Sequence, residues 1–133
     1  MQQSLSINSE IQELQRVFEW LDQVLGAQGP VTQDFKVVCD ELLSNIIHYG
    51  LDDNSHCVIE LALSIDHSAV QLHIIDQARP FNPLARTTPD LEIPVDERDI
   101  GGLGIALTCS LTDDQHYRYE DGRNYLTVIK KTG

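Results

Sequence analysis

Apolar residues recur every three or four positions in two stretches of the chain, and this spacing predicts two amphipathic helices. The first covers about residues 10–25, and the turn-forming segment 26–30 ends it. Ser9, with Gln12 three residues later, is a capping-box signal, so Ser9 is expected to cap this helix. The second helix is expected to begin with Thr32 as its cap and to end at Gly50.

Alternation of apolar and polar residues predicts the strands. Residues 2–7 alternate weakly and suit a short edge strand. The runs 59–65 and 70–74 alternate more clearly and predict an antiparallel hairpin, as do residues 116–120 and 125–130. Hairpins with helices inserted between them indicate an α+β fold. We expect a two-layer α/β sandwich with a mixed, mostly antiparallel sheet and helices on one face.

Two further segments complete the predicted organisation of a single domain over residues 1–133. Residues 84–100 are polar, hold two prolines and lack any periodicity. An irregular segment of this length in a small domain is more often a functional lid than a plain connection. A third helix is expected to begin near Gly102 and to run to about Leu111.

Charge and composition limit the possible partners. The formal net charge is −12, from 21 acidic and 9 basic residues, so the surface repels nucleic acid and anionic membranes. A polyanionic ligand would have to be held by backbone amides and a divalent cation. No apolar run approaches the roughly 18 residues of a membrane span, and the first residues do not resemble a signal peptide. The three cysteines show no metal-ligand spacing, which favours reduced thiols in a cytoplasmic protein.

The second predicted helix carries the first group of candidate site residues. At 100° per residue, Glu41, Asn45 and His48 fall within about 60° of one another. The predicted apolar side of the same helix holds Val38, Cys39, Leu42, Leu43 and Ile46. The neutral oxygen of Asn45 can complete the shell of a Mg²⁺ ion, and Glu41 can act as a general base. Taken alone, these residues also fit an ordinary solvated helix face, with His48 interacting with the helix dipole.

Two more motifs suit a nucleoside triphosphate. Asp76 ends a predicted strand, where its carboxylate can accept a hydrogen bond from an exocyclic amine such as that of adenine. Gly101, Gly102 and Gly104 precede a helix, where backbone N–H groups and the helix dipole favour phosphates. Separately, Asp76 fits an ordinary turn and the glycines fit a flexible loop. Their order and context together favour the nucleotide interpretation.

The sequence resembles the anti-sigma-factor serine kinases (RsbW-like) of the GHKL, or Bergerat-fold, ATPase superfamily over nearly its whole length. Glu-Leu-Leu-Ser-Asn-Ile-Ile-His-Tyr-Gly at 41–50 matches the N box of that family. Asp-Gln-Ala-Arg-Pro-Phe-Asn-Pro at 76–83 matches its G1 box. Gly-Gly-Leu-Gly-Ile-Ala-Leu at 101–107 matches its G2 box, and residues 124–130 resemble its closing strand.

The resemblance assigns a role to each site residue. It implies Glu41 as the base that activates an acceptor serine, Asn45 as a Mg²⁺ ligand, and Asp76 as the partner of the adenine amine, with Thr127 supporting the same edge. Gly101, Gly102 and Gly104 would contact phosphates, and Arg98 in the lid would reach the terminal phosphate. The other residues expected around the nucleotide are His48, Ala78, Pro80, Phe81 and Leu103. Ala78 stands where the G1 box usually has glycine.

The implied function is an ATP-dependent protein serine kinase with Mg²⁺ as its metal. In the family's scheme such a kinase binds a sigma factor and holds it inactive, or phosphorylates a STAS-domain anti-anti-sigma antagonist. A homodimer is implied as well, with the first strand and helix as candidate contact elements. The alternative is a nucleotide-sensing binding module that sequesters a regulatory partner without transferring phosphate.

Overall fold

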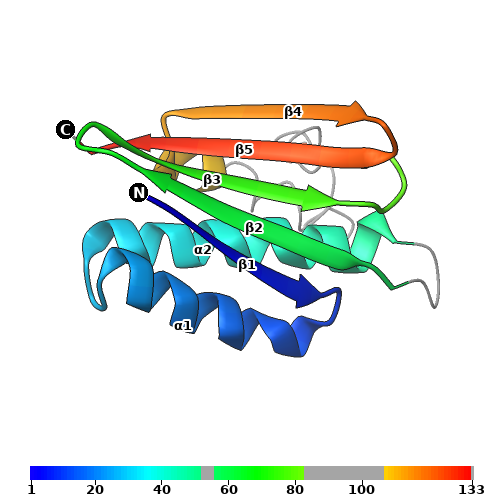
Figure 1. Cartoon of the computed structure of the whole chain (residues 1–133), viewed down its shortest axis with the longest axis horizontal. Coiled ribbons are helices and arrows are strands. Elements are labelled where there is room, and N and C mark those ends of the chain that lie inside the picture. Colours follow the sequence, from blue (N-terminus) through cyan, green and yellow to red (C-terminus); the bar gives the residue numbers. More distant parts are fainter. Residues whose placement is uncertain (52–55, 83–106, 133) are drawn as a thin grey trace, which may run out of the picture.

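An antiparallel sheet and two long helices form two layers in the computed structural model, which describes residues 1–51, 56–82 and 107–132 (Figure 1). The five described strands are β1 (Gln2–Asn8), β2 (Val58–Ile65), β3 (Ala69–Asp76), β4 (Asp114–Glu120) and β5 (Arg123–Lys131). Their order is β1-β2-β3-β5-β4, and each of these neighbouring pairs is antiparallel. The predicted two-layer sandwich is therefore confirmed. The predicted lid at 84–100 and the expected start of the third helix lie outside the described residues.

Both long helices cover the same side of the sheet (Figure 1). A short 3₁₀ turn, η1 (Ile11–Glu13), leads into α1 (Leu14–Leu25). The second helix, α2 (Pro30–Asn45), continues into a π-helical turn, η2 (Ile46–Gly50). Residues 107–111 are also helical. No helix in the described ranges has both the length and the apolar character needed to span a membrane.

The core lies between the helices and the inward face of the sheet. Alternate residues of β3, such as Leu72 and Ile74, are buried, and they meet Phe35, Leu42 and Leu21 of the helices in one apolar cluster. Complete burial of each of these side chains contributes about 1.5–3 kcal/mol to stability. The alternation read from the sequence therefore specifies which face of each central strand packs on the helices.

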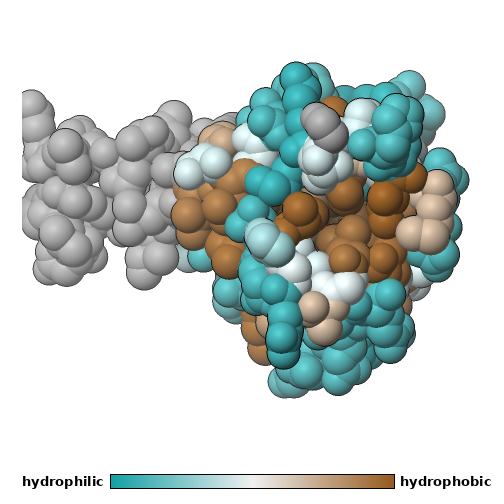
Figure 2. Space-filling view, turned by 90° about the vertical axis from the view of Figure 1, so that its left-hand side faces the viewer, coloured by the Kyte–Doolittle hydropathy of each residue, from teal (hydrophilic) through white to brown (hydrophobic). Residues whose placement is uncertain are grey.

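Hydrophobic residues also reach the surface at the end of the sandwich where both chain termini lie (Figure 2). A hollow of about 250 Å³ between β1 and α1 is lined by Met1, Gln3, Trp20, Gln23 and Val24. Because β3 runs away from this end, Asp76 at its last position lies toward the opposite end of the sheet (Figure 1). The hydrophobic end is thus separate from the Asp76 region.

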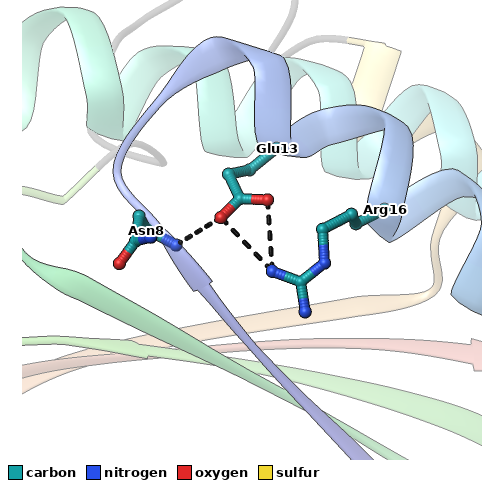
Figure 3. Close-up of polar contacts among 3 residues, drawn as sticks. All are labelled: Asn8, Glu13 and Arg16. Atoms are coloured by element: carbon teal, nitrogen blue, oxygen red, sulfur yellow. Dashed lines mark hydrogen bonds and ion pairs between the residues drawn. The ribbon is translucent and has the colours of Figure 1, made fainter.

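The predicted cap of the first helix is wrong. Ser9 makes no capping bond; its hydroxyl accepts a hydrogen bond from Cys57 N at 3.0 Å, and its own N–H donates to Cys57 O at the same distance. Glu13 holds the helix start instead, because its carboxylate accepts from Asn8 N and from Arg16 (Figure 3). The Asn8 N–H, followed by Arg16, lowers the pKa of Glu13.

The predicted cap of the second helix is wrong as well. The helix begins at Pro30, which suits the first helical position because proline has no N–H to leave unpaired. Thr32 therefore lies inside the first turn, where its buried hydroxyl donates to Gly26 O. This bond ties the start of α2 to the turn after α1. The predicted end at Gly50 is confirmed.

Replacing Ser9 with alanine tests the link between the first helix and the start of β2. The Cys57 N–H would lose its acceptor, so the free energy of unfolding should fall by about 1–3 kcal/mol. Urea unfolding measures this, with Ser6→Ala on the exposed side of β1 as the matched control. Equal stability of the two variants would contradict the assigned role of Ser9.

Candidate functional site

The three candidate residues of the second helix differ in their burial. Asn45 is buried, Glu41 is half-buried and His48 is exposed, with its ring edge-on to that of Tyr49. Asn45 lies seven residues after Val38, which is only about 20° around the helix, so both side chains turn toward the core. The π-helical turn that begins at Ile46 changes the spacing of the residues after it.

Asn45 is the most buried of the three candidate residues on this helix. Its side chain is 4% exposed, and its Nδ2 makes no hydrogen bond within the described residues. A buried unpaired donor costs about 1–3 kcal/mol, so a ligand group at this point would remove a real penalty. The oxygen and nitrogen of an amide are distinguished only by their surroundings, and the opposite orientation would direct Oδ1 to the same point. The side chain therefore fits either a phosphate oxygen or a Mg²⁺ ion.

Glu41 lies one helical turn before Asn45. Burial, followed by the charge of Asp40, raises the pKa of Glu41. A carboxylate with a raised pKa is a better proton acceptor near neutral pH, because it holds a transferred proton more firmly.

Asp76 is the best-defined group of the site. It is 3% exposed at the end of β3, and its Oδ1 accepts hydrogen bonds from Ala78 N at 3.0 Å and from Asn124 Nδ2 at 2.9 Å. No hydrogen bond reaches Oδ2 from the described part of the chain. Burial raises the pKa of Asp76, while the bonds from Asn124 and Ala78 lower it.

Asn124 is a site residue that sequence reasoning missed. The β3–β5 register places it directly opposite Asp76, and its side chain is 3% exposed. Besides Asp76, its Nδ2 contacts Arg79 O at 2.9 Å and Ala78 O at 3.3 Å. Its position in the strand was a usable signal, because Asn124, Leu126 and Val128 share the inward face. A polar residue there needs partners inside the fold.

The expectation for Thr127 is wrong. Thr127 stands opposite His73, and its hydroxyl lies 3.0 Å from His73 Nδ1. Both residues belong to the half-buried positions that alternate with the buried ones, so they lie on the face of the sheet away from the helices. Asp76 faces the opposite side, and Thr127 therefore cannot support the same edge.

The turn after Asp76 is docked against the end of the second helix. Arg79 Nη2 donates to Tyr49 O, and the Phe81 ring packs so closely on Gly50 that an added Cβ would lie 3.0 Å from its Cδ1. Ala78 is buried without a positive φ angle, so this position has no need for the backbone freedom of glycine. Pro80 is exposed. These contacts join the Asp76 turn to the helix that carries Asn45.

The glycine-rich motif and the lid residue lie outside the described residues: Arg98, Gly101, Gly102, Leu103 and Gly104. A hollow of about 420 Å³ does reach Asp76, but its other lining residues include Val58, Glu60 and Ile75. These face the side of the sheet away from the helices. This hollow is therefore distinct from the region between Asp76 and α2.

Comparisons with known proteins agree with the geometry. The family model for the histidine kinase-like ATPase domain matches residues 7–130. The serine/threonine-protein kinase BtrW of Bordetella bronchiseptica is 30% identical over 89 residues. That alignment covers 67% of this chain and 63% of BtrW, so it spans less than two thirds of the relative's length.

Asp76→Asn should make the folded protein more stable at pH 7. Burial raises the pKa of Asp76, so the protonated form of this side chain stabilises the folded state. That stabilisation is fully present below the unfolded pKa of about 3.9, and it is lost as pH rises through the folded pKa. Asparagine keeps the acceptor oxygen and has no charge to bury. Thermal unfolding from pH 3 to 8 measures the difference, which should shrink at the acid end.

Asp66→Asn is the control of opposite sign. Hydrogen bonds from Ser68 and Ala69 lower the pKa of Asp66, so its stabilising effect is present above the unfolded pKa and is lost as pH falls through the folded pKa. This variant should be less stable than wild type at pH 7. If Asp76→Asn is instead less stable than wild type at pH 7, burial of the ionised Asp76 carboxylate does not destabilise the fold, and the prediction is wrong.

Proposed function

This chain belongs to the histidine kinase-like ATPase domain family, and we propose that it is an ATP-dependent protein serine kinase that acts as an anti-sigma regulatory factor. One observation carries the proposal: the buried Asp76 carboxylate and the buried Asn45 side chain, whose Nδ2 has no partner among the described residues, lie on two elements that the turn over residues 77–82 docks together. A carboxylate on the sheet and an amide on the helix docked against it suit the base and the phosphates of a nucleotide.

Asp76 is the proposed contact of the adenine base. Its Oδ1 is occupied by Ala78 N and Asn124 Nδ2, so Oδ2 is the oxygen left to accept a hydrogen bond from the adenine amine. The same two bonds fix the carboxylate plane before any ligand arrives. A base with a carbonyl in place of the amine would meet the negative oxygen and be repelled.

Asn45 and Glu41 are the proposed residues of phosphoryl transfer. ATP supplies the phosphoryl group, and Mg²⁺ neutralises its charge when bound. Asn45 would donate its Nδ2, which has no partner in the described part of the chain, to a phosphate oxygen, or would turn its Oδ1 to the metal. Glu41 would take the proton of the acceptor serine, a role that its raised pKa favours. Arg98, Gly101, Gly102 and Gly104 complete the proposed phosphate site.

The proposed partners are a sigma factor and a STAS-domain antagonist that carries the acceptor serine. The resemblance of the N, G1 and G2 boxes supports them, and the relative BtrW is named as a serine/threonine-protein kinase. The net charge of −12 disfavours nucleic acid and membrane surfaces as partners. A cytoplasmic location and a homodimer that uses β1, an edge strand of the sheet, belong to the same proposal.

ATP affinity tests the base contact. Asp76→Asn replaces the negative oxygen with an amide that cannot accept equally well, so we expect ATP to bind about 10- to 100-fold more weakly. Thr127→Val is the control, since its side chain lies on the other face of the sheet. Calorimetry measures both; equal affinities for the two variants would remove Asp76 from the site.

Kinase activity separates the proposal from its alternative, the non-catalytic sequestering module. Glu41→Gln should keep ATP affinity and lower phosphoryl transfer to a STAS-domain acceptor by about 10²- to 10⁴-fold. Asn45→Ala should weaken Mg²⁺-dependent ATP binding as well. Glu19→Gln makes the same substitution at an exposed position of α1 and serves as the matched control. A wild-type protein that binds ATP and a sigma factor but labels no STAS acceptor would favour the sequestering module.

A further inference from the structure

Asn124 joins three separate parts of the chain through one side chain. Its Oδ1 accepts hydrogen bonds from Phe81 N at 3.0 Å and from the hydroxyl of Tyr117 on the edge strand β4. Its Nδ2 donates to Asp76 Oδ1 and to the carbonyls of Ala78 and Arg79. Every polar atom of this buried side chain is therefore in use.

These contacts determine which way the amide points. A backbone N–H can only donate, so the atom that faces Phe81 N must be the oxygen. The Tyr117 hydroxyl donates to the same oxygen and reinforces the choice. The NH₂ group is then forced toward Asp76, where it binds Oδ1, while Oδ2 has no partner among the residues that the structure describes. The reverse orientation would place an amide oxygen against a carboxylate.

The direction of the amide decides what Asp76 offers to a ligand. An NH₂ group beside the carboxylate favours the ionised form, which only accepts hydrogen bonds. Without it, the pKa of Asp76 would rise further, toward the protonated acid, which can donate to a carbonyl. Among the described residues, the charge of Asp76 also raises the pKa of Cys57 and of Tyr117, and neither group is a cation that could replace the lost donor.

We propose that Asn124, held by Tyr117, is the positioning residue that makes the site select a purine with an exocyclic amine over one with a carbonyl at that place. The proposal rests on the proposed ATP site and adds the residues that enforce the choice of base. Tyr117 lies outside all the motifs that resemble the family, so base selection extends to the edge strand of the sheet.

Binding of Mg²⁺–ATP and Mg²⁺–ITP tests this, because ITP carries a carbonyl where ATP has the amine. Wild type should prefer ATP. Tyr117→Phe removes one neutral hydrogen bond and should lower the ATP-to-ITP preference by about 3- to 10-fold. Asn124→Asp keeps the shape but sets a second carboxylate beside Asp76, so a proton shared between them should bring the preference close to one. Thermal unfolding verifies that each variant is folded.

Tyr125→Phe is the matched control, because Tyr125 is the neighbouring strand residue, on the outer face beneath Arg118. It should keep the wild-type preference. A folded Tyr117→Phe that also keeps it, or that weakens ATP and ITP equally, overturns the positioning role while the ATP site stands. A wild-type protein that binds neither nucleotide overturns the proposed function and this inference together.

Discussion

The candidate site depends on one buried interaction, the hydrogen bond from Asn124 Nδ2 to Asp76 Oδ1. Asp76 is 3% exposed at the last position of β3, so its ionised carboxylate is costly to bury and needs hydrogen-bond donors. The antiparallel β3–β5 register supplies the compensation, since it puts Asn124 opposite Asp76 without any special loop. The sheet pairing that builds the core thus also supplies the hydrogen-bond donor for the Asp76 carboxylate.

The same pairing organises the residues after the strand. Asn124 accepts from Phe81 N and donates to two carbonyls of the turn, so the turn closes over the asparagine. Phe81 then reaches Gly50, and Arg79 reaches the carbonyl of Tyr49. Two distant parts of the sequence are in this way brought together by one inward-facing amide.

The layers and most elements could be predicted because they follow from apolar periodicity, which every buried residue reinforces. The helix caps could not. Ser9 and Thr32 have the right chemistry and spacing for caps, yet each binds a backbone group of a neighbouring segment, Cys57 N and Gly26 O. A local motif cannot show that a tertiary partner competes for the same side chain. The inward direction of Asn45 follows from its helical position, about 20° from that of Val38. The π-helical turn that follows has no such signal in the sequence.

Some site residues could likewise be predicted from local motifs, whereas others depend on tertiary geometry. Asp76 and Asn45 could be predicted because their motifs state both residue type and position, and the fold brings their elements together. The role of Thr127 was implied by the family resemblance, but strand geometry sends every second side chain to the opposite face. Counting from the register, Asp76 shares a face with Asn124, not with Thr127. In a sheet-based site, therefore, the face on which a strand residue lies decides whether it can reach the ligand, and an inward-facing polar residue is the stronger candidate even when the resemblance assigns it no role.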